Sequence, residues 1–556
     1  MDIQVNNKKV TAQKLRGGYY TPIKIAEYLS SWAIKDDECK ILEPSVGDGN
    51  FIIAALQASQ IYKKKVSIVA VEIENAEISK AKNRVTNIDM VSQITWICDD
   101  FFIAYDKLKK SEKFDVVLGN PPFIRFQRFE EKSREIAFAH LRDAGYKPNK
   151  LYNTWVAFVE LSIQLLKDGG KLAMVLPAEL LQVNYASELR KKLSKCFSNI
   201  VIIGFKKIIF PEIQQEIVLL LAKGKKEEND QRSDIQTIEY ENGDDLLEKR
   251  DKTFKTISHI PTKHSRNGMK WTSLFLSNSA FKALDKAQKH SSLLRLGHYA
   301  DVNVGIVTGQ NSYFLLRENV KEELDASDYV TIIIGKTSAL QSINFTEEDF
   351  NIYKQKFPAY LLDFTGIEYE ALNKQVKDYI RLGETKEINL GYKCRIRPRW
   401  YDVPSIYVPD GFLFRQIHKF PLLVINNAAV TSTDTIHRVR FKKPVNKELF
   451  SACFFNSLTL AWSEVCGRSY GGGVLELEPR EAIELPIPYS SAISLDHKKV
   501  EYLLRIGSWR QALDYVDKVV LIDYLGFDFK IVKNIRNAWI ELRDRRNNRK
   551  NGATNI

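Results

Sequence analysis

The chain has 556 residues, of which 44% are apolar and 27% are charged. This length allows two or three folded domains, and the apolar content excludes a largely disordered protein. With 82 basic and 69 acidic side chains the formal charge is +13, which favours a polyanionic partner. Charge alone does not separate nucleic acid from an anionic membrane surface.

Membrane insertion, metal binding and disulfide formation are not expected. No apolar run reaches the length of about 18 residues that spans a bilayer, and the polar start Met1–Lys9 lacks a signal-peptide core. The six cysteines form no CxxC pair, and the eight histidines have no metal-ligand spacing. These features predict a cytosolic protein with reduced thiols and no metal site.

The segment Tyr20–Thr21–Pro22 precedes the first predicted helix, Ile23–Trp32, whose apolar residues have helical spacing. Thr21 can cap this helix with Pro22 at the first helical position. A helix cap is therefore the structural explanation of this segment.

The first predicted strand, Cys39–Glu43, runs into a turn that starts at Pro44 and contains Gly47 and Gly49. A glycine turn between a strand and a helix lets a ligand approach bare backbone. The spacing differs from the dinucleotide fingerprint, and the acidic Glu43 argues against a pyrophosphate and for a cationic amino-acid headgroup. Taken alone, the turn also fits a purely structural role.

The next two predicted strands also end in acidic residues. Val66–Val71 is followed by Glu72, which is well placed to accept both ribose hydroxyls of a nucleoside. Ile94–Cys98 is followed by Asp100 and Phe101, where a carboxylate can accept from an adenine amino group while a ring packs on the base. Because the carboxyl ends of parallel strands meet at one edge, these residues predict a nucleoside site there.

The fourth predicted strand, Phe114–Leu118, ends in Gly119–Asn120–Pro121–Pro122–Phe123. The two prolines stop the strand because neither can donate to a ladder and each fixes φ. The Asn120 side chain and the Pro121 carbonyl are two acceptors on a stiff turn, which suits an exocyclic amine, and the Phe123 ring suits a flat base. The tetrapeptide alone fits a strand-ending turn with a buried Phe equally well.

The first part continues with an irregular or partly helical segment, Ile124–Lys150, and then with alternating elements. These are a helix at 155–166 closed by Lys167–Gly170, a strand at 171–176, a helix at 187–197, and strands at 200–204 and 216–222. Between the last two strands lies Phe210–Pro211, where Phe210 can stack on the second face of a flipped base. By itself, Phe210 fits a core residue better.

The order and spacing of these motifs resemble those of gamma-class DNA adenine N6-methyltransferases, the TaqI-like, NPPY-type modification enzymes of Type II restriction systems. The resemblance covers about the first 225 residues. Two positions depart from the family pattern. Phe123 replaces the commoner Tyr, and the cofactor turn reads Pro-Ser-Val-Gly-Asp-Gly where the family often has Phe-x-Gly-x-Gly.

The resemblance implies an α/β fold, with a Rossmann-like, S-adenosylmethionine-dependent methyltransferase domain at residues 1–225 built on a mostly parallel seven-stranded sheet. The charged segment 226–263 is expected to be a linker with one strand, Ile235–Tyr240. Residues 264–556 are expected to form a C-terminal α+β target-recognition domain that ends in helices at 500–512 and 530–545.

The resemblance also implies a role for each site residue. The residues that would bind S-adenosylmethionine are Tyr20, Thr21, Pro22, Glu43, Pro44, Gly47, Gly49, Glu72, Asp100, Phe101 and Asn120. The catalytic residues would be Asn120, Pro121, Pro122 and Phe123, with Phe123 and Phe210 on the two faces of an extruded adenine. Methyl transfer to the adenine N6 would then rest on positioning and electrostatics, without a nucleophilic Ser or Cys.

Basic and glycine-rich motifs in the second part are candidates for DNA contacts. Arg395, Arg397 and Arg399 are interleaved with aromatic residues, which suits phosphate clamping or a bidentate contact to guanine. A solvated basic strand is the alternative. Tyr470 and the glycines around Gly472 can let backbone enter a groove.

The expected partners are double-stranded DNA and a cognate restriction endonuclease that acts separately, and no membrane partner is expected. The enzyme is expected to be a monomer. Its expected location is a bacterial or archaeal cytoplasm, where DNA binding associates it with the nucleoid. A second hypothesis is a methyltransferase of a protein glutamine amide or an RNA base, since an Asn-Pro-Pro-aromatic turn serves any planar NH2 group. A third is a catalytically silent DNA-binding specificity protein. The third is disfavoured because every cofactor-edge residue is present.

Overall fold

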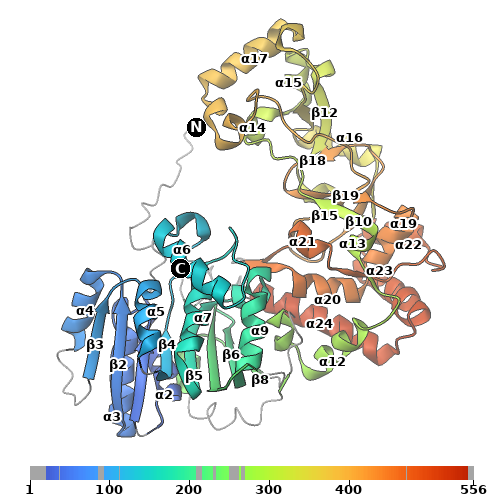
Figure 1. The fold of residues 1–556 in the computed structure, drawn as a ribbon. Coiled ribbons are helices and arrows are strands. Elements are labelled where there is room, and N and C mark those ends of the chain that lie inside the picture. The colour runs from blue at the N-terminus through green and yellow to red at the C-terminus, as the bar shows by residue number, and fades with distance from the viewer. Residues whose placement is uncertain are drawn as a thin grey trace. The chain divides into compact units, whose positions relative to one another are not determined.

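The computed structural model describes residues 20–36, 38–85, 93–111, 113–207, 209, 216–228, 233–249, 262–263, 270–470 and 473–548. The chain divides into two compact units, Met1–Phe275 together with Asn548–Ile556, and Leu276–Asn547. Figure 1 shows the helices and strands of the two units, and each unit has its own core of buried apolar side chains.

One sheet organises the first unit. Its strands are β1 (Glu38–Glu43), β2 (Lys65–Glu72), β3 (Gln93–Cys98), β4 (Phe114–Gly119), β5 (Leu166–Pro177), β6 (Phe197–Phe205), β7 (Ile217–Lys225) and β8 (Asp234–Tyr240). Among the described residues these eight strands have the order β3-β2-β1-β4-β5-β7-β6-β8, and β7 alone runs against the others. The predicted α/β fold with a mostly parallel sheet is confirmed, with eight strands in place of seven.

The eighth strand comes from the segment that was predicted to be a linker. β8 pairs in parallel with β6, and its residues Ile235 and Tyr240 are buried. Because the sequence that precedes the strand is charged, composition alone does not indicate that side chains of the strand are buried in the core. A short helix, α10 (Gly243–Glu248), follows, and the first unit extends to Phe275 rather than to residue 225. The assignment of the two units to catalysis and to target recognition stays a prediction.

Helices cover both faces of the sheet. They are α2 (Ile23–Ala33), α3 (Asn50–Tyr62), α4 (Asn75–Val85), α5 (Phe101–Lys110), α6 (Glu131–Asp143), α7 (Thr154–Leu165), α8 (Glu179–Gln182) and α9 (Ser187–Cys196). Leu29 of α2 and Ile52 of α3 share one core with Ile41 and Val116 of the sheet. α5 and α7 contact each other on the other face. Residues 167–170, predicted to close the α7 helix, belong to β5 instead.

The carboxyl ends of β1 to β4 lie at one edge of this sheet, as their parallel pairing requires. The first three strands each lead into a helix: β1 is followed by α3, β2 by α4 and β3 by α5. The fourth strand end leads into the turn that begins at Asn120. The polar residues expected at this edge therefore come together.

The second unit is a mixture of short strands and helices, which confirms the predicted α+β class. Its strands are β9 (Leu294–Arg295), β10 (Ala300–Asn303), β11 (Leu315–Leu316), β12 (Val330–Ile334), β13 (Asn344–Phe345), β14 (Tyr360–Leu362), β15 (Gly411–Phe414), β16 (Gln416–Ile417), β17 (Leu423–Asn426), β18 (Thr431–Ser432), β19 (Ile436–Phe441), β20 (Arg468–Tyr470), β21 (Val474–Glu476) and β22 (Pro486–Ile487). The largest sheet of the described part of this unit has five strands in the order β10-β19-β15-β17-β13.

Helices complete the second unit. They are α12 (Asn278–Ala287), α13 (Leu296–Tyr299), α14 (Asn311–Phe314), α15 (Glu318–Glu323), α16 (Glu347–Lys356), α17 (Lys374–Thr385), α18 (Tyr392–Arg395), α19 (Lys447–Phe454), α20 (Ser457–Cys466), α21 (Pro479–Ala482), α22 (His497–Arg505), α23 (Trp509–Val516) and α24 (Phe529–Asn548). The helix predicted at 500–512 is broken into α22 and α23 because Gly507 adopts φ +76° between them. Arg546 of α24 pairs with Glu464 of α20 at 2.7 Å, and both side chains are 3% exposed.

Within the described part of the chain, no single helix combines the length and apolar composition needed to cross a membrane. α19 and α20, taken together as a bent pair, meet that test by length and composition alone.

Candidate active site

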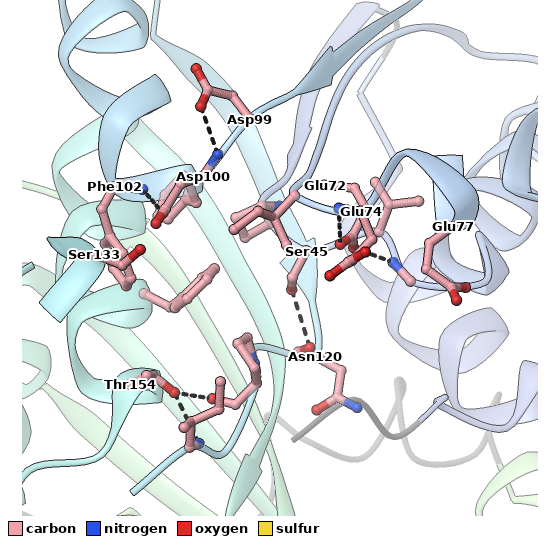
Figure 2. Close-up of a pocket in the computed structure, with 18 of the residues that line it drawn as sticks. Ser45, Glu72, Glu74, Glu77, Asp99, Asp100, Phe102, Asn120, Ser133 and Thr154 are labelled. Atoms are coloured by element: carbon pink, nitrogen blue, oxygen red, sulfur yellow. Dashed lines mark hydrogen bonds between the residues drawn. The ribbon is translucent and has the colours of Figure 1, made fainter. Parts of the chain in front are cut away.

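A cavity of about 400 Å³ lies at the carboxyl ends of β1 to β4 (Figure 2). Nine of the predicted site residues line it: Tyr20, Thr21, Pro44, Gly47, Glu72, Asp100, Phe101, Asn120 and Pro122. Five others, Pro22, Glu43, Gly49, Pro121 and Phe123, are sequence neighbours of lining residues but do not line the cavity. Phe210 lies outside the described residues.

The glycine turn after β1 is wedged against α4. Gly47 and Gly49 have φ values of +54° and +83°, which L side chains rarely adopt. A Cβ on Gly49 would lie 2.8 Å from the Cβ of Ala81. Arg84, also on α4, donates to the Asp48 carbonyl at 2.6 Å and to the Asn50 Oδ1 at 2.7 Å. Close packing against Ala81 and hydrogen bonds from Arg84 therefore both hold the turn against α4.

The carboxylate of Glu72 joins β2 to this turn. It accepts from the Gly47 amide at 2.9 Å and from the Glu74 amide at 3.1 Å (Figure 2). Burial raises the pKa of Glu72, while these amides oppose the shift. A carboxylate has about four acceptor positions, so capacity remains for the hydroxyl groups of a ligand.

Asp100 lies two residues beyond the end of β3. Its side chain caps α5 by accepting from the Phe102 amide at 2.8 Å, and the residue is mostly buried. The neighbouring Asp99 accepts from the Asp100 amide at 2.8 Å (Figure 2). The acidic end of β3 is thus held rigidly at the cavity wall.

Glu43 and Thr21 carry buried polar atoms that lack hydrogen-bond partners among the described residues. Glu43 is 1% exposed and Thr21 is 4% exposed. Burial, and then the neighbouring Asp48 and Glu72 carboxylates, raise the pKa of Glu43 well above its ordinary value. The predicted capping role of Thr21 is wrong, because Pro22 is the N-cap of α2 and no side chain caps that helix. Buried polar groups of this kind mark a place where a polar ligand can bind.

An aromatic wall closes the side of the cavity next to Asp100. The ring of Phe101 stacks on that of Phe158 with centroids 5.0 Å apart and planes at 20°. Phe102 contacts both Phe158 and Phe129 edge-on or tilted, at 4.9 Å and 5.8 Å. This wall offers a flat, apolar surface of the kind that a purine ring packs against.

The turn after β4 meets the glycine turn at the cavity. A Cβ on Gly119 would lie 3.3 Å from Pro44, so the two turns are in close contact. The hydroxyl of Ser45 donates to the Asn120 carbonyl at 3.1 Å, and the hydroxyl of Thr154 donates to the Pro122 carbonyl (Figure 2). Asn120 therefore lines the same cavity as residues predicted to hold the cofactor.

Comparison with known proteins relates both halves of the chain to DNA methyltransferases. Residues 5–277 match the model of the N-6 DNA methylases, and residues 268–521 match that of the C-terminal domain of the Type II methyltransferase M.Eco57I. The first half of the chain is therefore similar to the N-6 DNA methylases. The predicted S-adenosylmethionine-dependent DNA adenine N6-methyltransferase is thereby confirmed, and the methylation of a protein or an RNA is not favoured.

Two relatives of the methylase match over most of their length. The Type II methyltransferase M.AccI of Acinetobacter calcoaceticus is 24% identical over 86% of this chain and 85% of its own. The Type II methyltransferase M.XamI of Xanthomonas campestris pv. amaranthicola is 21% identical over 85% of both chains. Among solved structures, a DrdV–DNA complex is 11% identical over 88% of this chain and 58% of that chain, with a TM-score of 0.48. The assignment of the methylase to the gamma class stays a prediction.

The residues around the cavity fit the cofactor of this family. S-Adenosylmethionine carries a cationic amino-acid headgroup, two ribose hydroxyls and an adenine ring. Glu43 has a buried carboxylate with no described partner, Glu72 keeps acceptor capacity, and Phe101 and Phe158 form an apolar wall. Among the described residues of the methylase, no group of three or more His, Cys, Asp or Glu side chains could hold a metal ion.

Several lining residues escaped the sequence analysis. Phe129, Thr154 and Phe158 line the cavity although none belongs to the predicted motifs, and Ser45 lines it from within the glycine turn although no role was predicted for it. Thr154 and Phe158 are four residues apart on α7, so they share one face of that helix. The sequence shows their four-residue spacing at the start of an apolar helix, but this spacing does not indicate that the shared face contacts the turn after β4.

The three arginines of the methylase that were predicted to contact DNA differ from one another in their surroundings. Arg397 donates to the carbonyls of Val307 and Thr308 at 3.0 Å and 2.7 Å. Arg399 donates to the Asp402 carboxylate and the Ile367 carbonyl, both at 2.7 Å. These two guanidinium groups fasten loops of the second unit, which departs from the expectation that they face DNA, whereas Arg395 is exposed.

Two further residues were predicted to contact DNA. Tyr470 ends β20, and Gly472 lies outside the described residues.

Proposed function

We propose that the cavity at the ends of β1 to β4 holds S-adenosylmethionine. Glu43 and Thr21 bind the methionine end, because their buried polar atoms have no described partner. The carboxylate of Glu72 binds the ribose, and Asp100 and the Phe101–Phe158 wall bind the adenine. When bound, the cofactor supplies a methyl group on a sulfonium sulfur, which an amine nitrogen takes by in-line displacement.

The turn after β4 binds the target adenine in this proposal. The Asn120 amide oxygen and the Pro121 carbonyl accept the two hydrogens of the N6 amine and hold its lone pair toward the cofactor side. Pro122 stiffens the turn by fixing φ. Phe123 and Phe210 stack on the extruded base, which offsets the loss of stacking in the duplex. The presence of Asn120 in the same cavity as Tyr20, Glu72 and Phe101 carries this assignment.

The wider setting is inferred from the family and the charge. We infer a gamma-class enzyme in which the second unit recognises a sequence in double-stranded DNA, with Arg395 as one contact to the backbone. A cognate restriction endonuclease would act separately on the same sequence. The net charge of +13 supports association with DNA, and the enzyme is proposed to act as a monomer in the bacterial or archaeal cytoplasm.

The replacement Asn120→Ala tests the role of this turn. We expect methyl transfer to be lost while the affinity for S-adenosylmethionine changes little, since the other cofactor contacts remain. Asn242→Ala is a matched control, because Asn242 only caps α10 by accepting from the Asp245 amide at 2.9 Å. Transfer by Asn120→Ala at the rate of Asn242→Ala would show that the turn is not the catalytic site.

A further inference from the structure

Two hydroxyl groups hold the peptide units on either side of the Pro121 carbonyl. Ser45 donates to the Asn120 carbonyl at 3.1 Å. Thr154 donates to the Pro122 carbonyl and accepts from the Ile124 amide at 3.1 Å (Figure 2). Among the described residues, no donor reaches the carbonyl of Pro121 itself.

This pattern leaves the turn little freedom. The backbone has two soft dihedrals per residue, and each proline ring fixes one of them, φ. The hydrogen bonds from Ser45 and Thr154 fix the peptide planes that precede and follow the Pro121–Pro122 peptide. With both neighbours fixed, the direction of the Pro121 carbonyl is determined.

Thr154 is itself held firmly. It is the first residue of α7, it is 2% exposed, and its amide donates to the Ile124 carbonyl at 3.1 Å. Its β-branched side chain has few allowed rotamers. Ser45 belongs to the turn after β1, and like Thr154 it lines the cavity. One anchor of the catalytic turn is therefore part of α7, and the other is part of the proposed cofactor turn.

We propose that Thr154 and Ser45 are positioning residues that aim the Pro121 carbonyl at the target amine. The proposal rests on the function proposed above, in which Asn120 and Pro121 bind that amine. Neither hydroxyl acts on the substrate directly, because each is used on a backbone carbonyl of the turn. Through Ser45, the placement of the amine is tied to the conformation of the turn that contacts the cofactor.

Thr154→Val and Thr154→Ser separate the hydroxyl from the shape of the side chain. Valine keeps the branched shape and lacks the donor, and serine keeps the donor. We expect Thr154→Val to lower the single-turnover rate at saturating cofactor and DNA by about 10- to 100-fold, the range that a misplaced reacting group costs. The Kd for S-adenosylmethionine and the thermal midpoint should stay near those of wild type, and Thr154→Ser should restore the rate.

Thr237→Val is the matched control. Thr237 lies in β8 and donates to the Leu274 carbonyl at 2.9 Å, so the same bond is lost away from the cavity. This variant should transfer methyl at the wild-type rate. The proposal is overturned if Thr154→Val also transfers at that rate, or if its rate, cofactor affinity and thermal midpoint fall together as in a merely structural role.

Ser45→Ala tests the second anchor and decides the matter if Thr154→Val does not fold. We expect a rate about 10-fold lower with the cofactor affinity retained, and an unchanged rate would overturn the proposal. A failure of the proposed function is seen separately. An active Asn120→Ala enzyme would refute the role of the turn, whereas an inactive one beside fully active Thr154→Val and Ser45→Ala variants would refute only the positioning.

Discussion

Replacing Gly49 by Ala tests whether the cofactor turn is wedged against α4. The added Cβ would lie 2.8 Å from the Ala81 Cβ and 3.1 Å from its Cα, in a residue with φ +83°. The left-handed backbone costs an L residue about 1–2 kcal/mol, and an extra methyl group in a packed site costs about 1–3 kcal/mol. The variant should therefore be less favourable by roughly 2–5 kcal/mol in total. This total is the sum of the loss in the free energy of unfolding and the loss in the free energy of cofactor binding.

Gly145→Ala separates the two contributions. Gly145 has φ +86°, and a Cβ added to it would meet no atom within 4 Å, so only the backbone cost applies. In the pair Gly49→Ala with Ala81→Gly, the Cβ contact is removed, and part of the loss should be recovered. Denaturant unfolding and calorimetric titration with S-adenosylmethionine measure the two free energies. If the two free-energy losses of Gly49→Ala add up to no more than those of Gly145→Ala, or if Ala81→Gly recovers nothing, the turn is not wedged against α4.

Two further predictions concern charge. The raised pKa of Glu43 means that the folded protein keeps a proton that the unfolded chain has lost above about pH 4.5, so this group lowers stability as pH rises. Glu43→Gln should therefore raise the thermal midpoint of the cofactor-free enzyme at neutral pH, and the difference from the wild-type midpoint should shrink toward pH 4. The same replacement should weaken cofactor binding. A difference in thermal midpoint that is the same at all pH values would contradict the stability prediction. Arg395→Ala should reduce the slope of log K against log salt for DNA binding by about 0.9, the change expected for one lost phosphate contact, and an unchanged slope would place Arg395 away from DNA.

Much of the first unit could be predicted because local signals and global fold agree there. The strands that end at Glu43, Glu72 and Gly119 are apolar runs stopped by acidic, glycine or proline residues. Parallel pairing then brings their ends to one edge without further information. β8 was expected only as a strand within a linker, because its charged surroundings conceal that it pairs with β6.

The rest depended on contacts between distant segments. The hydroxyl of Thr154 meets Pro122 across 32 positions, and Arg397 reaches Thr308 across 89. A basic residue beside aromatic residues predicts an anion contact equally well whether its guanidinium faces solvent or clamps a loop of its own unit. The cap assigned to Thr21 failed for a related reason, since its buried hydroxyl lies at the cavity and does not cap α2.

The most direct measurement is a map of the bases that the enzyme modifies. Purified protein is incubated with labelled S-adenosylmethionine and unmethylated genomic DNA, and the modified positions are identified by sequencing. The proposed function predicts N6-methyladenine at one short sequence and no label in cytosine, RNA or protein. Label that appears on any of these instead, with adenine left unmodified, would contradict it.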